Sequence, residues 1–211
     1  MARSERDPGQ VIRLPRPRAA ARGAALRIAP TGARRAPWYV RLILAAQRRK
    51  YGRPLAPSLA WARLPRAFAA LTLLYRALDR AGSPLAPGLR ALVQVRVSQL
   101  NGCAFCVDAN SAAALQRHVG SEKLAALADA TDASVFDARE RAALAYAAAM
   151  TETGRGVDDA LFAWLRREFD EDAVVELTAL VAFQNMTSKF NAALGIPAQG
   201  LCALPGAKEG P

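Results

Sequence analysis

Apolar side chains recur at helical spacing along the chain from Trp38 onward. A first run starts there and ends in three basic residues before Gly52, and a second starts at Pro65 and ends before Gly82. Proline is favoured in the first turn of a helix, cationic side chains in the last turn, and glycine just beyond it. These runs therefore predict two helices whose ends are marked in the sequence.

The segment Leu92–Val97 is ambiguous by pattern alone. Valine at positions 93, 95 and 97 alternates as in a half-buried strand. A helix would instead gather five apolar side chains on one face: Leu89, Leu92, Val93, Val97 and Leu100. The pattern is compatible with both structures, and the neighbouring helices favour a helix.

Downstream segments carry clearer signals. Asp137 followed by Glu140 has the form of a capping box, in which each side chain accepts a backbone N–H of the other residue. Asp170 is placed to cap the last helix, and Gly195 with Pro197 beyond it to end that helix. The predicted helices cover residues 103–118, 121–124, 138–153, 157–169 and 171–194.

The chain is predicted to be an all-α helical bundle with a disordered N-terminal tail. Residues 1–36 mix Arg, Ala, Pro and Gly without apolar periodicity, so they cannot bury enough surface to become ordered. Residues 37–196 form the helical domain, with the part around the cysteine pair spanning 86–196. Residues 197–211 are expected to form a flexible tail. One domain is the natural size for 211 residues, of which 52% are hydrophobic.

The net charge of +11 is unevenly distributed. Residues 1–53 carry a balance of +12, whereas residues 54–211 carry −1. A nucleic-acid-binding domain usually presents a basic face that tracks phosphates, and the folded part has no such excess. Nucleic-acid binding is therefore not expected of the domain, and any affinity for polyanions would belong to the N-terminal segment.

No uninterrupted apolar stretch approaches the roughly 20 residues of a membrane-spanning helix. The longest candidate, Ala67–Tyr75, is flanked by Arg66 and Arg76. The first 30 residues contain arginine throughout and lack the apolar core of a secretory signal. Three cysteines do not make a disulfide framework. A soluble, cytoplasmic protein without membrane contact is expected.

The chemistry is expected at Cys103 and Cys106, a Cys-Ala-Phe-Cys pair that opens a predicted helix. The first turn of a helix exposes unpaired N–H groups and the positive end of the helix dipole, which stabilise a thiolate. The pKa of such a thiol falls below its usual value of about 8.5, so the nucleophilic form becomes populated near neutral pH. Spacing i, i+3 places both sulfurs on one face, close enough to form a disulfide.

Two other interpretations of the pair stay open at this level. A zinc site needs more ligands, but the chain has no second Cys-x-x-Cys pair, and its only histidine, His118, lies 12 residues beyond Cys106. Cys202 stands alone in the predicted tail, so no metal is expected. Buried cysteines can also be packing residues without chemistry. From the residues alone, the redox and packing interpretations weigh about equally.

The stretch Leu92–Asn110 (LVQVRVSQLNGCAFCVDAN) resembles the signature of the carboxymuconolactone decarboxylase/alkylhydroperoxidase AhpD-like family. In that signature, a helix ending in Ser-x-x-Asn-Gly-Cys leads into a Cys-x-x-Cys helix. The similarity extends over residues 40–196 and includes Glu176-Leu177-Thr178 and Asn185 in the last helix. The resemblance implies an all-α fold, assembly as a trimer or hexamer with a dimer as a further option, and peroxidase activity in the AhpD branch.

In the peroxidase branch the second cysteine attacks the peroxide and the first resolves it, which implies Cys106 and Cys103 here. A glutamate twelve residues before the first cysteine and a histidine four after the second relay protons in that branch. Ala91 and Asn110 occupy these positions. Alanine cannot take a proton, and asparagine forms hydrogen bonds but has no useful pKa. Asn110 shares the cysteine face, so it is expected to orient a water or a thiol.

Polar candidates near the pair are Asp108, Ser111, Gln94 and Ser98, and Glu176 is a further candidate from the last helix. Asp108 lies off the cysteine face and is expected to be a solvated helix carboxylate. Gln94 and Ser98 either point toward the pair or form hydrogen bonds between helices. Glu176 either supplies a base or is a surface charge, and His118 is expected to cap or complement a helix C-terminus.

These observations favour a thiol-dependent oxidoreductase with alkylhydroperoxidase, or peroxiredoxin-like, activity. Its partners would be a hydroperoxide or disulfide substrate and an external dithiol reductant, and no haem, flavin or other cofactor is implied. A thiol–disulfide exchange or redox-sensing protein without peroxidase activity is one alternative. A non-enzymatic oligomer with inert cysteines is a second. A decarboxylase is a third, against which the cysteine pair counts.

Overall fold

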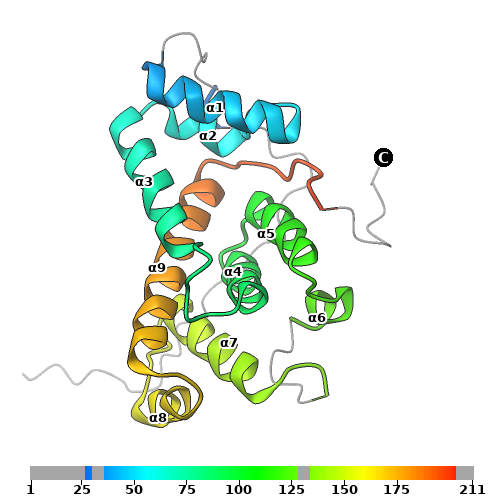
Figure 1. Cartoon of the computed structure of the whole chain (residues 1–211), viewed down its shortest axis with the longest axis vertical. Helices are drawn as coiled ribbons and strands as arrows, with labels where there is room; N and C mark the ends of the chain where they lie inside the picture. Colours follow the sequence, from blue (N-terminus) through cyan, green and yellow to red (C-terminus); the bar gives the residue numbers. More distant parts are fainter. Residues whose placement is uncertain (1–26, 30–35, 128–133, 203–211) are drawn as a thin grey trace, which may run out of the picture.

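The computed structural model describes residues 27–29, 36–127 and 134–202, and all regular secondary structure within these ranges is helical. Figure 1 shows the helices arranged around a central one, α4, which is seen nearly end-on. The predicted all-α fold class is therefore confirmed. No helix among the described residues is long and apolar enough to cross a membrane.

Three helices precede the cysteine-bearing part: α1 (Trp38–Tyr51), α2 (Ala56–Trp61) and α3 (Pro65–Leu78). The helices α1 and α3 were predicted, but α2 was not, because six residues are too few to show an apolar period. Such a short helix needs tertiary packing to hold it. The ring of Trp61 supplies some of that packing, because it stacks on Phe190 of the last helix with ring centroids 4.0 Å apart.

The ambiguous segment is part of α4 (Pro87–Leu100), which packs against α5, α7 and α9. Every residue from Leu89 to Ser98 except Arg96 is buried. A helix that is covered on all sides carries apolar side chains on more than one face, so it shows no single amphipathic stripe. This burial explains why the valines at 93, 95 and 97 resembled a strand, and the favoured helix is confirmed.

The remaining helices are α5 (Ala104–Gln116), α6 (Ser121–Ala126), α7 (Ala138–Thr151), α8 (Asp159–Glu168) and α9 (Glu171–Ala193). The capping box of Asp137 and Glu140 is present in both directions. Asp170 caps α9 as predicted, and Asp158 caps α8. Each capping carboxylate satisfies an N–H group that the first helical turn leaves unpaired.

The interior consists of one large apolar core and two smaller clusters. The large core lies among α4, α7, α8 and α9, and five of its fully buried side chains are Leu92, Phe136, Leu144, Leu165 and Leu177. One small cluster joins the N-terminal helices, and the other surrounds the cysteines. The cysteine pair therefore lies beside the main core, where α4 and α9 end.

Both ends of the described chain lie against other parts of the fold. Arg27 falls within the segment expected to be disordered, yet its backbone N–H donates to the carbonyl of Leu194 at 3.1 Å. Residues 196–202, called the strap below, run between α2 and α5 (Figure 1). The rest of both predicted tails, 1–26, 30–35 and 203–211, lies outside the described residues.

Candidate active site

The cysteine pair begins where α4 ends. Gly102 has a left-handed φ of 62°, and the backbone N–H groups of Gly102 and Cys103 donate to the carbonyls of Gln99 and Ser98, both at 3.0 Å. This arrangement is a Schellman ending, which favours glycine because a side chain would be strained at that φ. Cys103 is also the N-cap of α5. The Asn-Gly-Cys sequence thus ends one helix and starts the next at a single residue.

Cys103 and Cys106 form a disulfide, and their Cα atoms are 5.2 Å apart. The backbone N–H of Cys106 donates to Sγ of Cys103 at 3.1 Å, in the way that a capping oxygen accepts from the first turn. The pair therefore lies at a helix start, as the sequence predicted. The unpaired N–H groups and the helix dipole at this position favour the thiolate form once the disulfide is reduced.

Asn191 of α9 is the side chain that donates to the second sulfur. Its Nδ2 lies 3.2 Å from Sγ of Cys106, and the residue is 4% exposed. Sequence reasoning missed this residue. A signal was present, because Gln184, Ser188 and Asn191 follow i, i+4, i+7 spacing and form a polar stripe on a helix that is otherwise apolar inside. All three are buried, and such a stripe needs partners.

Asn101 fixes the end of α4 against α9. Its Nδ2 donates to Oδ1 of Asn185 at 2.8 Å and to Oγ of Ser188 at 2.9 Å. The Asn of the Asn-Gly-Cys signature and the Asn185 noted in the last helix are therefore partners in space. This contact holds the chain reversal before Cys103 at a fixed place along α9.

Asn110 donates its Nδ2 to Oγ of Ser98 at 3.1 Å and to the carbonyl of Gln94 at 3.4 Å. Ser98 is fully buried and also accepts Nε2 of Gln184 at 3.0 Å. Of the two roles considered for Ser98, hydrogen bonding between helices is the one observed. Among the described residues, no hydrogen bond joins Asn110 to either sulfur. Ser98 of α4 is thereby linked to α5 through Asn110 and to α9 through Gln184.

Ala91, at the position of the family's glutamate, is 1% exposed and belongs to the main apolar core. No proton relay runs through it. Glu176, the other carboxylate considered as a base, forms an ion pair with Arg80 at 2.6 Å and a hydrogen bond with Ser83. It precedes Asn191 by 15 residues, or about 22 Å along α9. Glu176 is therefore neither a base at the cysteines nor a free surface charge.

Both sulfurs are shielded from solvent, since Cys103 is 1% exposed and Cys106 is 4% exposed. The shielding side chains are apolar and come mainly from α2 with the residue before it and from the strap: Leu55, Ala56, Ala60, Ile196 and Leu201. In this state the disulfide has no direct path to a bulky reductant. Access to the sulfurs requires that one of these covering segments move.

The expectation that Asp108 is a solvated carboxylate is wrong. The residue is half-buried, and its two oxygens accept the backbone N–H groups of Gln199, Leu201 and Cys202 at 2.8, 3.0 and 2.7 Å. Hydrogen bonds to a charged acceptor are stronger than neutral ones. Asp108 thereby ties the strap to α5, two residues beyond Cys106. Its role was hidden because its partners lie more than 90 residues later in the chain.

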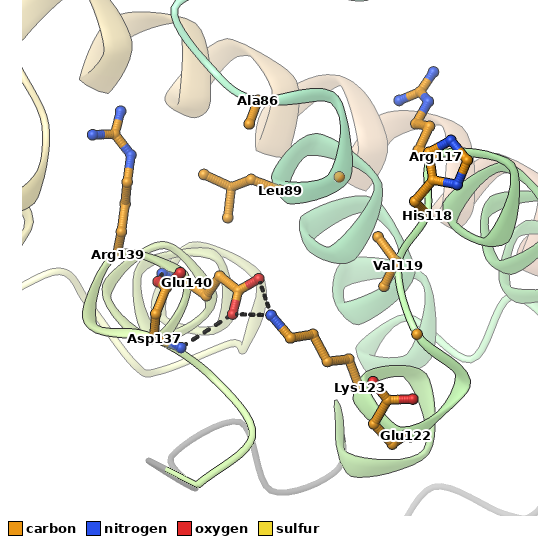
Figure 2. A pocket seen from close by; sticks show the side chains of 12 residues that line it. Ala86, Leu89, Arg117, His118, Val119, Glu122, Lys123, Asp137, Arg139 and Glu140 are labelled. Carbon is orange, nitrogen blue, oxygen red and sulfur yellow. Dashed lines mark hydrogen bonds and ion pairs between the residues drawn. The ribbon is translucent and has the colours of Figure 1, made fainter.

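A pocket of about 360 Å³ lies at the opposite end of α5, near His118 (Figure 2). The φ of His118 is 62°, and its backbone N–H donates to the carbonyl of Leu115, which ends the helix. Lys123 and Glu140 in the pocket wall are paired at 2.6 Å. The 13 residues of α5 span about 20 Å between the cysteine pair and His118, so the pocket is separate from the cysteine site.

Within the described ranges, no group of three or more His, Cys, Asp or Glu side chains is arranged to hold a metal ion. The polar groups that reach the two sulfurs are a backbone N–H and an asparagine amide. These are hydrogen-bond donors, suited to stabilising negative charge on sulfur. This arrangement can stabilise negative charge on either sulfur once the disulfide is reduced.

The fold and the site define a class of protein: an all-helical domain with a disulfide-forming Cys-x-x-Cys pair at a helix start. The AhpD-core, peroxidase-related protein from Ralstonia eutropha JMP134 has this fold, with a TM-score of 0.72 over 82% of this chain and 92% of that chain, at 22% identity. The debrominase Bmp8 aligns with a TM-score of 0.71 over 82% of this chain and 91% of Bmp8, at 24% identity. At these identities the likeness shows the fold alone.

Sequence comparison supplies the family. Residues 65–149 match the Carboxymuconolactone decarboxylase family. The uncharacterized protein YnjA of Escherichia coli K12 is 44% identical over 158 residues, which is 75% of this chain and 87% of YnjA. The uncharacterized protein YdfG of Bacillus subtilis 168 is 29% identical over 107 residues, 50% of this chain and 73% of YdfG. The chain belongs to the carboxymuconolactone decarboxylase/AhpD-like family, which confirms the resemblance.

Proposed function

We propose that this protein is a thiol-dependent oxidoreductase that reduces hydroperoxides through Cys103 and Cys106. The observation that carries the proposal is the disulfide at the start of α5, with one hydrogen-bond donor on each sulfur. Donors and a helix N-terminus lower the pKa of a thiol, and a second cysteine within bonding distance removes the oxidised product. Membership of the carboxymuconolactone decarboxylase/AhpD-like family supports the same proposal.

The proposed cycle has three balanced steps. The Cys106 thiolate attacks the OH-bearing oxygen of the hydroperoxide, the O–O bond breaks, and the alkoxide leaves and takes up a proton to become an alcohol. The Cys103 thiolate then attacks the sulfur of the resulting Cys106 sulfenic acid, forming the disulfide and releasing hydroxide, which is protonated to water. An external dithiol reduces the disulfide and is itself oxidised to a disulfide. These steps balance without a metal, haem or flavin.

Asn110 enters the proposal as a residue that positions the site. Its amide holds Ser98 and the Gln94 carbonyl, so it fixes α5 against α4 one turn beyond Cys106. It cannot act as a general base, because an amide has no useful pKa. The proton relay of the AhpD branch is thus missing at both of its positions, Ala91 and Asn110.

That loss favours a second candidate function, thiol–disulfide exchange or redox sensing without peroxidase activity. Exchange needs a stabilised thiolate and a resolving thiol, but it needs no relay to protonate an alkoxide. The two candidates differ in substrate rather than in the residues used. A disulfide substrate that reacts faster with the reduced protein than a hydroperoxide does would favour this alternative.

The test uses reduced protein from which the reductant has been removed. Addition of an alkyl hydroperoxide should consume two thiols per chain much faster than in the urea-unfolded chain. Cys103→Ser should accumulate a sulfenic acid on Cys106 that dimedone traps, whereas Cys106→Ser should not react. Cys202→Ser serves as the control and should behave as the wild type. Thiol loss no faster than in the unfolded chain would refute the peroxidase proposal.

We also propose that the chain assembles with copies of itself, as the family resemblance implies. The helices α3 and α9 carry exposed apolar side chains, among them Leu73 at 67% and Val175 at 69% exposure. Exposed apolar surface of this kind is typical of association sites. Sedimentation equilibrium of the whole chain distinguishes dimer, trimer and hexamer, and a monomer at every concentration would contradict the proposal.

A further inference from the structure

Asn191 has a polar atom that nothing in the described structure satisfies. Its Nδ2 donates to Sγ of Cys106, but its Oδ1 is buried and has no hydrogen-bond partner among the described residues. The residue is 4% exposed, so the oxygen lies in the interior beside the sulfur. A buried amide oxygen without a partner is unfavourable and rare in native proteins, so it requires an explanation.

Three neighbouring buried side chains, Ser98, Gln184 and Ser188, differ from Asn191 because the hydrogen bonds they form join α4 and α9. Ser98 accepts from Gln184, Ser188 accepts from Asn101, and the hydroxyl of Ser188 donates to a carbonyl of its own helix. Fixing α4 against α9 is therefore accomplished without Asn191. If Asn191 only filled space, an apolar residue would give a more stable fold, because it would bury no unpaired oxygen.

The side chains around Cys106 explain why an amide donor is needed there. From the strap and from α9 the packed groups are apolar, with Ile196, Leu201 and Ala192 among them. The charged groups that reach this end of the fold include the carboxylate of Asp108, which accepts N–H groups of the strap, and the guanidinium groups of Arg27 and Arg53, which donate to the carbonyls of Ala193 and Gln199. Burial among apolar groups raises the pKa of a thiol, and a donated N–H lowers it.

We propose that Asn191 is a catalytic residue, an inference that rests on the proposed function. Its Nδ2–H stabilises the Cys106 thiolate, and its Oδ1 accepts the O–H of the bound hydroperoxide. The two ends of one amide would then hold the nucleophilic sulfur and the oxygen that it attacks side by side. In the attack, the S–O bond forms and the O–O bond breaks. The hydroxyl hydrogen stays on the transferred oxygen, and the leaving alkoxide takes its proton from water.

The first arm of the test measures the pKa of Cys106 and does not depend on peroxidase activity. The rate of alkylation by iodoacetamide is followed against pH in reduced protein that carries Cys103→Ser and Cys202→Ser. Asn191→Leu should raise the pKa of Cys106 by about one to two pH units, because a hydrogen bond to a charged group is lost. Asn191→Asp should raise it further, since a carboxylate would lie beside the thiolate.

The second arm isolates the free oxygen. Above the pKa of every variant, all of the Cys106 is thiolate, so the loss of the donor no longer limits the rate. Alkylation of Asn191→Leu should then equal or exceed the wild-type rate, because a thiolate of higher pKa is more nucleophilic. The rate with alkyl hydroperoxide should stay about tenfold below wild type, because the acceptor for its O–H is missing.

Thr178→Val is the matched control, because it also removes a side-chain hydrogen bond between α9 and another helix, here to Tyr146 of α7, at a position 13 residues before Asn191. This control should change neither the pKa of Cys106 nor the ratio of the hydroperoxide rate to the alkylation rate at high pH. Equal pKa values in Asn191→Leu, Asn191→Asp and wild type would overturn the role of the donor. Equal hydroperoxide rates at high pH would overturn the role of Oδ1. If the wild-type protein does not react with hydroperoxides, the proposed function and the role of Oδ1 are both refuted. The measurement of the Cys106 pKa still tests whether Nδ2 of Asn191 stabilises the thiolate.

Discussion

Asp108 accepts the backbone N–H of Leu201 at 3.0 Å, and the side chain of the same Leu201 packs on the cluster that contains both cysteines. Leu201 is therefore both bound by the carboxylate of Asp108 and part of the cover over the disulfide. The carboxylate belongs to α5, the helix that the cysteine pair opens. Cover and reactive pair are thus tied to the same helix.

Asp108→Asn is expected to make the disulfide easier to reduce. The neutral amide loses the charge that strengthens three hydrogen bonds, and its NH₂ group opposes one of the three N–H donors. If the strap loses about 1.5–3 kcal/mol of closure free energy, it opens about 10- to 100-fold more often. Thiol titration during reduction by a dithiol measures this rate.

Asp172→Asn is the matched control, because Asp172 is an exposed carboxylate in the first turn of α9. It should leave the reduction rate within about twofold of wild type. A rate in Asp108→Asn that equals this control would show that reductants reach the disulfide by another path, such as displacement of α2.

Asn110→Ala is expected to lower the free energy of unfolding by about 1–2 kcal/mol. The substitution removes the hydrogen bonds to Ser98 and to the Gln94 carbonyl that hold α5 against α4. Urea denaturation measures the loss. Alkylation kinetics of reduced protein should show a smaller rise in the pKa of Cys106 than Asn191→Leu causes. A larger rise would place Asn110, rather than Asn191, nearest the reacting sulfur.

Ser98→Ala is expected to destabilise the fold by about 2–4 kcal/mol. The change leaves Nε2 of buried Gln184 without its acceptor and takes the shorter hydrogen bond from Asn110. Ser111→Ala provides the control, because Ser111 is also buried, on α5, but forms no side-chain hydrogen bond within the described ranges. Similar urea midpoints for the two variants would contradict the role of Ser98 as a link between three helices.

Tyr75→Phe is expected to remove part of the loss of stability at alkaline pH. Burial of the hydroxyl, with Asp79 nearby, raises the pKa of Tyr75 above its usual value of 10.0. The folded state therefore keeps a proton that the unfolded chain releases, so its stabilising effect is full below pH 10.0 and declines as pH rises through the folded pKa.

Urea denaturation at about pH 8 and about pH 11 measures this effect. Wild type should lose more unfolding free energy between the two conditions than Tyr75→Phe does. Because Tyr75 is 41% exposed, the difference is expected to be small. An equal loss of unfolding free energy in both proteins would show that other titratable groups cause the loss of stability at alkaline pH.

The sequence predicted the helices wherever their ends are marked by local chemistry. Gly52, the capping box of Asp137 and Glu140, and the cap at Asp170 depend on residues within a few positions of one another, so a pattern along the chain contains them. The same holds for the junction at Gly102 and Cys103, where one glycine and one sulfur end α4 and open α5. The resemblance to the carboxymuconolactone decarboxylase/AhpD-like family also rests on the residues of this junction.

The sequence could not show which distant side chains meet the sulfurs. Asn191 lies 85 positions from Cys106, and Asp108 lies 91 from Gln199, so no local period links either pair. The α2 helix and the valines of α4 escaped the pattern because packing, rather than amphipathic spacing, fixes them. Local sequence thus determined where the thiols lie and that a helix N-terminus faces them. Only the tertiary fold decided which amide reaches Cys106 and which carboxylate holds its cover, because those contacts form when α9 and the strap fold back onto α5.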